Sequence, residues 1–185
     1  MRWRCRRWPS SAHRPARALL DGRLAAQRLV GLNAALLPFD GPAGWVFAPL
    51  ARLMSRQPWV PWLLARRARD PAAVQRLVAT TGSRLDAEGL ALYARLVRCP
   101  GHVAGALAMV ADWDLATLWQ DLSRLPVPLG LLVATRDGTL PPAQALRVRE
   151  RLPATRVRKL VGLGHLAHEE AAARVVGPLR DLLLR

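Results

Sequence analysis

Apolar and polar positions along the chain predict three short strands with helices between them. The first strand is the apolar run at 28–33, which is flanked by residues that break secondary structure, and the other two are at 129–134 and 156–160. Helical periodicity predicts helices at 70–79, 86–97, 102–111, 115–122, 142–151 and 169–184. Helices between successive strands imply a parallel sheet with crossover helices, so the sequence indicates an α/β fold.

A long apolar region with many prolines separates the first two predicted strands. It covers residues 45–112, and its most apolar part contains Arg52, Arg56 and three prolines, which argues against a transmembrane span. Trp59 and Trp62 fit a lid over an apolar pocket; the competing interpretations are an interfacial membrane helix and ordinary core packing. We favour the lid, and we expect a cytoplasmic protein for which peripheral membrane contact through the lid stays open.

These elements divide the chain into three parts. Residues 1–17 are a basic stretch without a periodicity that would bury a face, residues 18–38 and 123–185 form a partial core, and residues 39–122 form the helical lid. The basic stretch lacks the apolar run of a signal peptide. It fits a basic tail, a targeting presequence or a segment that is not native.

The net charge of +15 would ordinarily suggest nucleic acid or an anionic membrane as a partner. Lys159 is the only lysine, however, and the remaining basic residues are arginines, which a GC-rich genome is sufficient to explain. The chain also lacks a basic helix face interleaved with aromatic residues, so we expect no nucleic-acid partner. Cys5 and Cys99 are too few for a metal centre, and we predict neither a metal nor a cofactor.

Two loops that follow predicted strands carry the candidate chemistry. Asp137 follows the strand at 129–134 and His165 follows the strand at 156–160, so both lie at the carboxyl edge of the sheet, where active sites form. A carboxylate there can accept the Nδ1–H of the histidine and stabilise the imidazolium formed during catalysis. An acid followed by a histidine is also the chain order of the last two members of a Ser-Asp-His triad. We predict Asp137 and His165 as a catalytic pair; the alternatives are an ordinary turn and a loop histidine.

Structural roles are expected for the neighbours of His165. Gly164 should allow a close approach to a pocket. His168 with Glu169 and Glu170 lacks a third cluster of metal ligands, and the two glutamates are expected to stabilise the N-terminus of the last helix through its dipole.

Four stretches of the chain resemble one protein family: GLNAALLPFDGPAGWVFAPLARLM, TTGSRLDAEGLALYARLV, HVAGALAMVADWDL and GLGHLAHEE. They are similar to the α/β-hydrolase-fold magnesium-chelatase accessory proteins of bacteriochlorophyll gene clusters (the BchO family), over about 20–185. The resemblance implies the C-terminal part of an α/β-hydrolase fold with a helical lid insertion. It also implies that Asp137 corresponds to the triad acid and His165 to the triad base.

The chain departs from this family at its start. The family begins with further strands and a G-x-S-x-G nucleophile elbow, whereas Ser10 and Ser11, which lie where the elbow is expected, have no flanking glycines. Reading two nucleotides downstream, with codons that the residues permit, can turn residues 1–8 into a buried strand that runs into such an elbow at residues 8–16. We therefore hypothesise that residues 1–17 are out-of-frame translation, from a frameshift or a wrongly assigned start, which the DNA sequence would test.

The resemblance implies an accessory protein of magnesium chelatase, acting beside magnesium insertion into protoporphyrin in bacteriochlorophyll synthesis. Because no nucleophile elbow is visible, we expect no catalytic activity from the chain as written. Two alternatives stay open: a serine esterase or other α/β-hydrolase acting on a small hydrophobic substrate, and a non-catalytic protein that binds a porphyrin or a chelatase subunit. The expected partners are thus a hydrophobic small molecule, such as a porphyrin or its ester, and magnesium-chelatase subunits.

Overall fold

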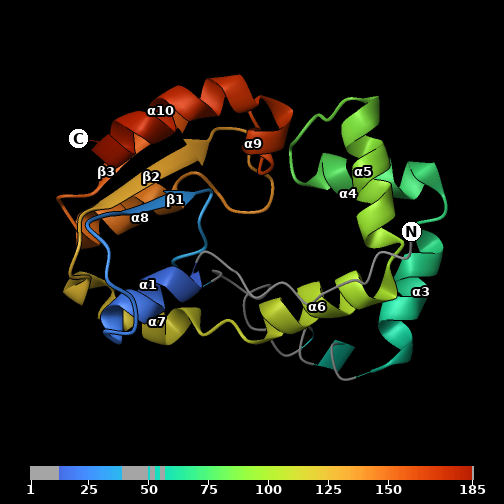
Figure 1. Ribbon diagram of the computed structural model, residues 1–185, viewed down its shortest axis with the longest axis horizontal. Helices are drawn as coiled ribbons and strands as arrows, with labels where there is room; N and C mark the ends of the chain where they lie inside the picture. Colours follow the sequence, from blue (N-terminus) through green and yellow to red (C-terminus); the bar gives the residue numbers. More distant parts are fainter. Residues whose placement is uncertain (1–12, 39–49, 51–52, 55–56, 185) are drawn as a thin grey trace. The chain divides into compact units, whose positions relative to one another are not determined.

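The computed structural model describes residues 13–38, 50, 53–54 and 57–184, and Figure 1 labels its elements. The described residues fall into two units. The helical unit contains residues 50, 53–54, 57–77 and 86–113, and the sheet unit contains residues 13–38, 78–85 and 114–184. Residues 78–85 and 114–122, which the sequence placed with the lid, therefore group with the sheet.

The sheet unit contains three parallel strands, β1 (Leu29–Leu32), β2 (Leu129–Ala134) and β3 (Arg156–Leu160). β2 is the central strand, with β1 and β3 hydrogen-bonded on either side of it. This arrangement confirms the predicted parallel sheet. Because the three strands run in the same direction, the loops that follow them meet at one edge of the sheet.

Helices cover both faces of β2. Leu132 and Ala134 belong to a cluster of buried side chains that includes Leu182 of α10 (Ala172–Leu184), the helix that lies along the sheet in Figure 1. On the opposite face, Leu131 lines a small cavity together with Val148 of α8 (Gln144–Arg151). Burial on both faces explains why β2 is an unbroken apolar run instead of an alternating one.

The sheet unit begins with α1 (His13–Leu20), which starts five residues before the predicted core. Ala16 and Leu19, three positions apart, are buried on one face of this helix. The expectation that no face is buried before residue 18 is therefore wrong for the end of the basic stretch, because an alanine contributes little to a hydropathy pattern. Arg17 of α1 also binds Asp121 at the end of α7 (Leu115–Asp121), with 2.6 Å between Nη1 and Oδ2.

The last helical segment is divided in two. α9 (Ala167–Glu170) is a single turn, and Ala171, with an extended φ of −157°, separates it from α10. The continuous helix expected from residue 169 is therefore wrong at its start. Glu170 is the last residue of α9, and its side chain accepts a hydrogen bond from the loop that carries His165.

The helical unit is formed by α3 (Trp59–Arg67), most of α4 (Pro71–Thr80), α5 (Ala87–Val97) and α6 (Pro100–Ala111). Within it, α6 packs against both α3 and α5. Pro71 and Pro100 begin their helices, where the missing N–H of proline costs no hydrogen bond, so they start helices instead of interrupting one. No helix in the described part of the chain is long and apolar enough to cross a membrane.

Candidate active site

Asp137 and His165 meet at the carboxyl edge of the sheet. Asp137 lies in the loop after β2 and His165 in the loop after β3, and Oδ2 of Asp137 is 2.8 Å from Nδ1 of His165. The side chain of Asp137 is 1% exposed, whereas that of His165 is 28% exposed. The structure thus brings the two residues that the sequence singled out into direct contact, with the acid buried behind a histidine that reaches solvent.

Both carboxylate oxygens of Asp137 are engaged. Oδ1 accepts hydrogen bonds from the backbone N–H groups of Thr139 and Leu140, each at 2.8 Å, which holds the carboxylate in one orientation. An ionised carboxylate only accepts hydrogen bonds, so Nδ1–H of His165 is the donor to Oδ2. A neutral imidazole in this tautomer has Nε2 as its acceptor, and Nε2 can take a proton from a hydroxyl or thiol nucleophile.

Asn33, the residue directly after β1, connects β2 to the histidine loop. Its Oδ1 accepts the N–H of Ala134 at 2.8 Å, and its Nδ2 donates to the carbonyl oxygens of His165 at 2.8 Å and Gly164 at 3.3 Å. Asn33 is buried and has a φ of +45°, which asparagine tolerates better than most residues. We did not predict this role, although a polar residue at the end of an apolar strand is a signal similar to the one that identified Asp137.

The turn that follows α4, residues 80–84, joins the acid loop to the histidine loop. The carbonyl oxygen of Thr81 accepts the N–H of Gly138 at 3.1 Å and the N–H of His165 at 3.0 Å. Ser83 is buried, and its Oγ accepts the N–H of Leu166 at 2.9 Å. The 80–84 turn is therefore part of the site. Its mix of threonine, glycine and serine indicates a turn, but nothing in that composition reveals what the turn contacts.

Glycines let the backbones of these segments touch. Gly82 has a φ of +75°, and a Cβ at this position would overlap the carbonyl oxygen of Arg136. A Cβ on Gly164 would overlap the backbone nitrogen of Ser83. The expectation that Gly164 allows approach to a pocket is therefore wrong, because the close approach is to the 80–84 turn.

Two charged side chains also bind backbone groups of these loops. Arg136 donates from Nη1 to the carbonyl oxygen of Gly162 at 3.1 Å and from Nη2 to that of Gly82 at 2.6 Å. Oε2 of Glu170 accepts the N–H of Gly164 at 2.8 Å. Glu170 therefore orders the histidine loop, which corrects its expected role at the start of the last helix. We call the acid loop, the histidine loop and the 80–84 turn together the Asp–His junction.

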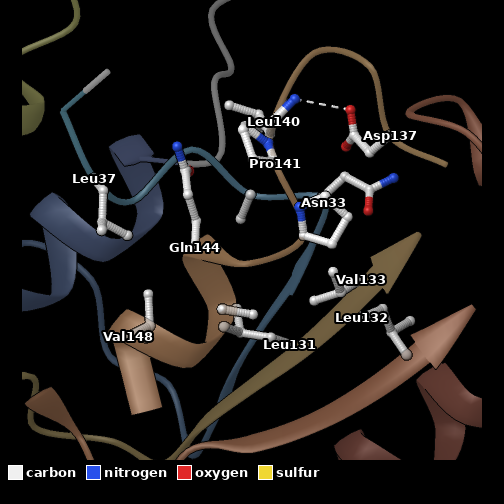
Figure 2. Close-up of a pocket in the computed structure, with 13 residues that line it drawn as sticks. Asn33, Leu37, Leu131, Leu132, Val133, Asp137, Leu140, Pro141, Gln144 and Val148 are labelled. Carbon is white, nitrogen blue, oxygen red and sulfur yellow. Dashed lines mark hydrogen bonds between the residues drawn. The ribbon is translucent and has the colours of Figure 1, made fainter. Parts of the chain in front are cut away.

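A cavity of about 30 Å³ lies between the acid loop and α8 (Figure 2). Asp137 and Asn33 contribute to its wall at the strand ends, and Leu131 and Val148 line it deeper in the sheet unit. A buried water molecule needs about 10–15 Å³ of such space, so this cavity has room for a few waters at most and is too small to receive a substrate.

Within the described ranges, no hydroxyl or thiol is hydrogen-bonded to Nε2 of His165. Ser10 and Ser11, and with them most of the stretch for which we hypothesise out-of-frame translation, lie outside the described residues. Groups of three or more His, Cys, Asp or Glu side chains that could hold a metal ion are absent from residues 13–38 and 57–184.

Comparison with solved structures identifies the fold. The chain is similar to an α/β-hydrolase-fold protein from Burkholderia ambifaria, with a TM-score of 0.67 and 18% identity, covering 92% of this chain and 62% of that one. It is also similar to a thermophilic esterase from Thermogutta terrifontis, with a TM-score of 0.65 and 19% identity, covering 93% and 61%. MenH from S. aureus matches with a TM-score of 0.57 and 16% identity, covering 91% and 66%. The class is therefore that of the α/β-hydrolase-fold proteins.

Sequence comparison narrows the class to a family. The chain is 37% identical over 156 residues to the magnesium-chelatase 30 kDa subunit of Rhodobacter capsulatus, which covers 84% of this chain. The chain belongs to the family of that subunit. It spans about half, 55%, of the length of this relative. No protein-family model matches the chain.

Proposed function

We propose that the chain is an α/β-hydrolase-like accessory protein of magnesium chelatase, acting beside magnesium insertion into protoporphyrin in bacteriochlorophyll synthesis. The observation that carries the proposal is the 37% identity over 156 residues to the magnesium-chelatase 30 kDa subunit. The partners would be chelatase subunits and an apolar small molecule such as a porphyrin. The helical unit would serve as the lid that admits this molecule.

In this proposal the Asp–His junction provides the acid and the base of a hydrolase site, and the described residues provide no nucleophile for it. Asp137 would orient His165 and stabilise its imidazolium, and Nε2 of His165 would take the proton of a nucleophile. The described residues provide no hydroxyl or thiol partner for Nε2, so proton transfer from a nucleophile has no donor there. We therefore propose an accessory role without catalysis for the chain.

The purified chelatase of Rhodobacter capsulatus offers a direct test. Magnesium-protoporphyrin formation would be followed by fluorescence with increasing amounts of the chain. We expect a saturable rise in the initial rate, and an equal rise with His165→Gln, because the role does not use the imidazole as a base. An unchanged rate with the chain in excess over the chelatase would overturn the proposal.

A second candidate function is hydrolysis of a small hydrophobic ester, which the 2.8 Å bond between Asp137 and His165 favours. A panel of p-nitrophenyl esters tests it, with His165→Gln as the matched variant. We expect release of p-nitrophenol at the rate of buffer alone. Turnover that disappears in His165→Gln would replace the accessory role by that of an esterase.

We also propose a cytoplasmic location with peripheral membrane contact through α3. Trp59 and Trp62 are more than half exposed on this helix, next to Arg66 and Arg67, and such a mixture of aromatic and basic side chains suits a membrane interface. Co-sedimentation with vesicles containing anionic lipid should fall when both tryptophans are changed to serine. Equal sedimentation of the two proteins would contradict the contact.

A further inference from the structure

The helical unit contains an apolar cavity of about 480 Å³, and nothing described so far uses it. The helices α3 to α6 all contribute to its walls: Leu64 of α3, Val74 and Leu77 of α4, Val97 of α5 and Leu107 of α6 are among the lining residues. Of the fourteen described residues that line it, twelve are apolar, and the two polar ones are Arg67 and His102. A volume of this size lies within the range of pockets that bind a ligand of drug size.

A second hollow adjoins the cavity, and most of the side chains that line it are charged. Arg67 and Ala73 line both spaces, and Arg66 and Arg76 line the second hollow. The guanidinium of Arg66 lies 5.5 Å from the ring centre of Trp62, and Arg76 is paired with Asp70 at 3.3 Å. Where the two spaces adjoin, Arg67 therefore lies among two further arginines, Arg66 and Arg76, and one acid, Asp70.

Arg67 differs from its neighbours in what its side chain contacts. Across the described part of the chain, its guanidinium has neither a hydrogen bond nor an ion pair nor an aromatic partner. A guanidinium that lines an apolar cavity and has no such partner among the described residues can form a two-point hydrogen-bonded pair with a carboxylate. The body of such a ligand would lie among the leucine, valine and alanine side chains.

We propose that this cavity binds an apolar molecule that carries a carboxylate, with Arg67 as the anchor of that carboxylate. The site lies entirely within the helical unit and does not include Asp137 or His165. Protoporphyrin, an apolar ring with two carboxylates, is the ligand that our proposed function supplies, and to that extent the inference rests on it. A fatty acid has the same chemistry and is the second source.

Fluorescence titrations of the full chain with protoporphyrin IX and with its dimethyl ester test the anchor. The ester keeps the apolar ring and removes both charges. We expect saturable binding with one ligand per chain, and an affinity about fivefold higher for the acid, which is the scale of an exposed pair of charges. Arg67→Gln should lower the affinity for the acid to that of the ester and leave the ester unaffected.

Arg69→Gln is the matched control, because Arg69 is an exposed arginine two residues away that lines neither space. It should retain the preference for the acid. Ala106→Trp, which adds a bulky side chain to the lining of the cavity, should weaken acid and ester alike. Equal affinities for acid and ester in the unmodified chain, equal losses in Arg67→Gln and Arg69→Gln, or full binding by a folded Ala106→Trp would each overturn the proposal.

Palmitate separates the two sources of the carboxylate. Displacement of protoporphyrin by palmitate, with the same loss in Arg67→Gln, supports a general site for apolar carboxylates. Protoporphyrin binding that palmitate does not displace supports a site selective for the ring. These titrations contain no chelatase, so a failure of magnesium chelatase to respond to the chain leaves their outcome interpretable, and the reverse also holds.

Discussion

In the Asp–His junction, backbone atoms of three segments touch one another, whereas most of the side chains that line the cavity of the helical unit are partly exposed. Gly82 and Gly164 have no space for a Cβ, and the N–H of His165 is bound to the carbonyl oxygen of Thr81. By contrast, Leu77 at the edge of the cavity is 50% exposed. The junction fixes one geometry, and the cavity leaves room for a ligand.

This difference predicts in which region an added methyl group should lower the stability of the protein more. A close contact between backbones cannot be repacked by a rotamer change, so an added methyl group must move a loop. An apolar cavity with partly exposed walls accepts such a group at little cost. Substitutions of matched chemistry in the two regions should therefore have unequal effects.

Gly82→Ala should have the largest effect. The new Cβ meets the carbonyl oxygen of Arg136, and alanine is strained at a φ of +75°. We expect a loss of about 3 kcal/mol in the free energy of unfolding, measured by urea denaturation. Gly105→Ala in α6 is the control, since a Cβ there meets nothing within 4 Å and should stabilise the helix by about 0.5–1 kcal/mol. Equal changes in the free energy of unfolding of the two variants would contradict the expected difference between the Asp–His junction and the helical unit.

Asn33→Ala should follow, with a loss of about 2–3 kcal/mol, because it leaves the buried N–H of Ala134 and the carbonyl oxygen of His165 without their partner. Asn33→Asp sharpens the test with almost the same shape. Its second oxygen would face the two carbonyl oxygens that Nδ2 now serves, so it should also destabilise the protein. Urea denaturation measures both, and a tolerated aspartate would show that the bonds to the histidine loop contribute little.

The smallest effect is expected at the exposed ion pair between α1 and α7. The hydrogen bond from Arg17 lowers the pKa of Asp121 below its ordinary value. A lowered pKa in the folded state means that the pair stabilises the protein above the ordinary carboxyl pKa, and this contribution is lost as pH falls through the lowered pKa.

Arg17→Gln should therefore be less stable than the unmodified chain at neutral pH, and the difference should vanish in acid. Thermal unfolding across this pH range measures it. Arg23→Gln, which removes an exposed partner of Asp21 at 2.8 Å, is the control and should leave the acid branch of the profile unchanged. A difference between Arg17→Gln and the unmodified chain that persists in acid would exclude the ion pair as its cause.

The sequence predicted the strands and the central pair because both leave a pattern along the chain. β2 is apolar at every position since both of its faces are buried, and Asp137 and His165 stand in the loops that follow strands, where side chains converge. These features depend on nearby residues alone.

The contacts that hold the pair in place leave no such pattern. Thr81 binds the backbone of His165, and Asn33 binds the backbone of Ala134. In each case the partner is a peptide group that lies 84 or 101 residues away along the chain. Peptide groups are the same at every position, and no residue type reveals which of them will meet. The early start of α1 was missed for a related reason, because its buried face depends on an alanine.

The hydrogen bond between Asp137 and His165 is the central claim, and NMR of the histidine ring in a ¹⁵N-labelled chain tests it most directly. The account predicts that, at neutral pH, His165 is the tautomer with its proton on Nδ1, that this proton exchanges slowly with water, and that Asp137→Ala abolishes its signal. A proton found on Nε2 instead, with a ring spectrum that Asp137→Ala leaves unchanged, would contradict the account.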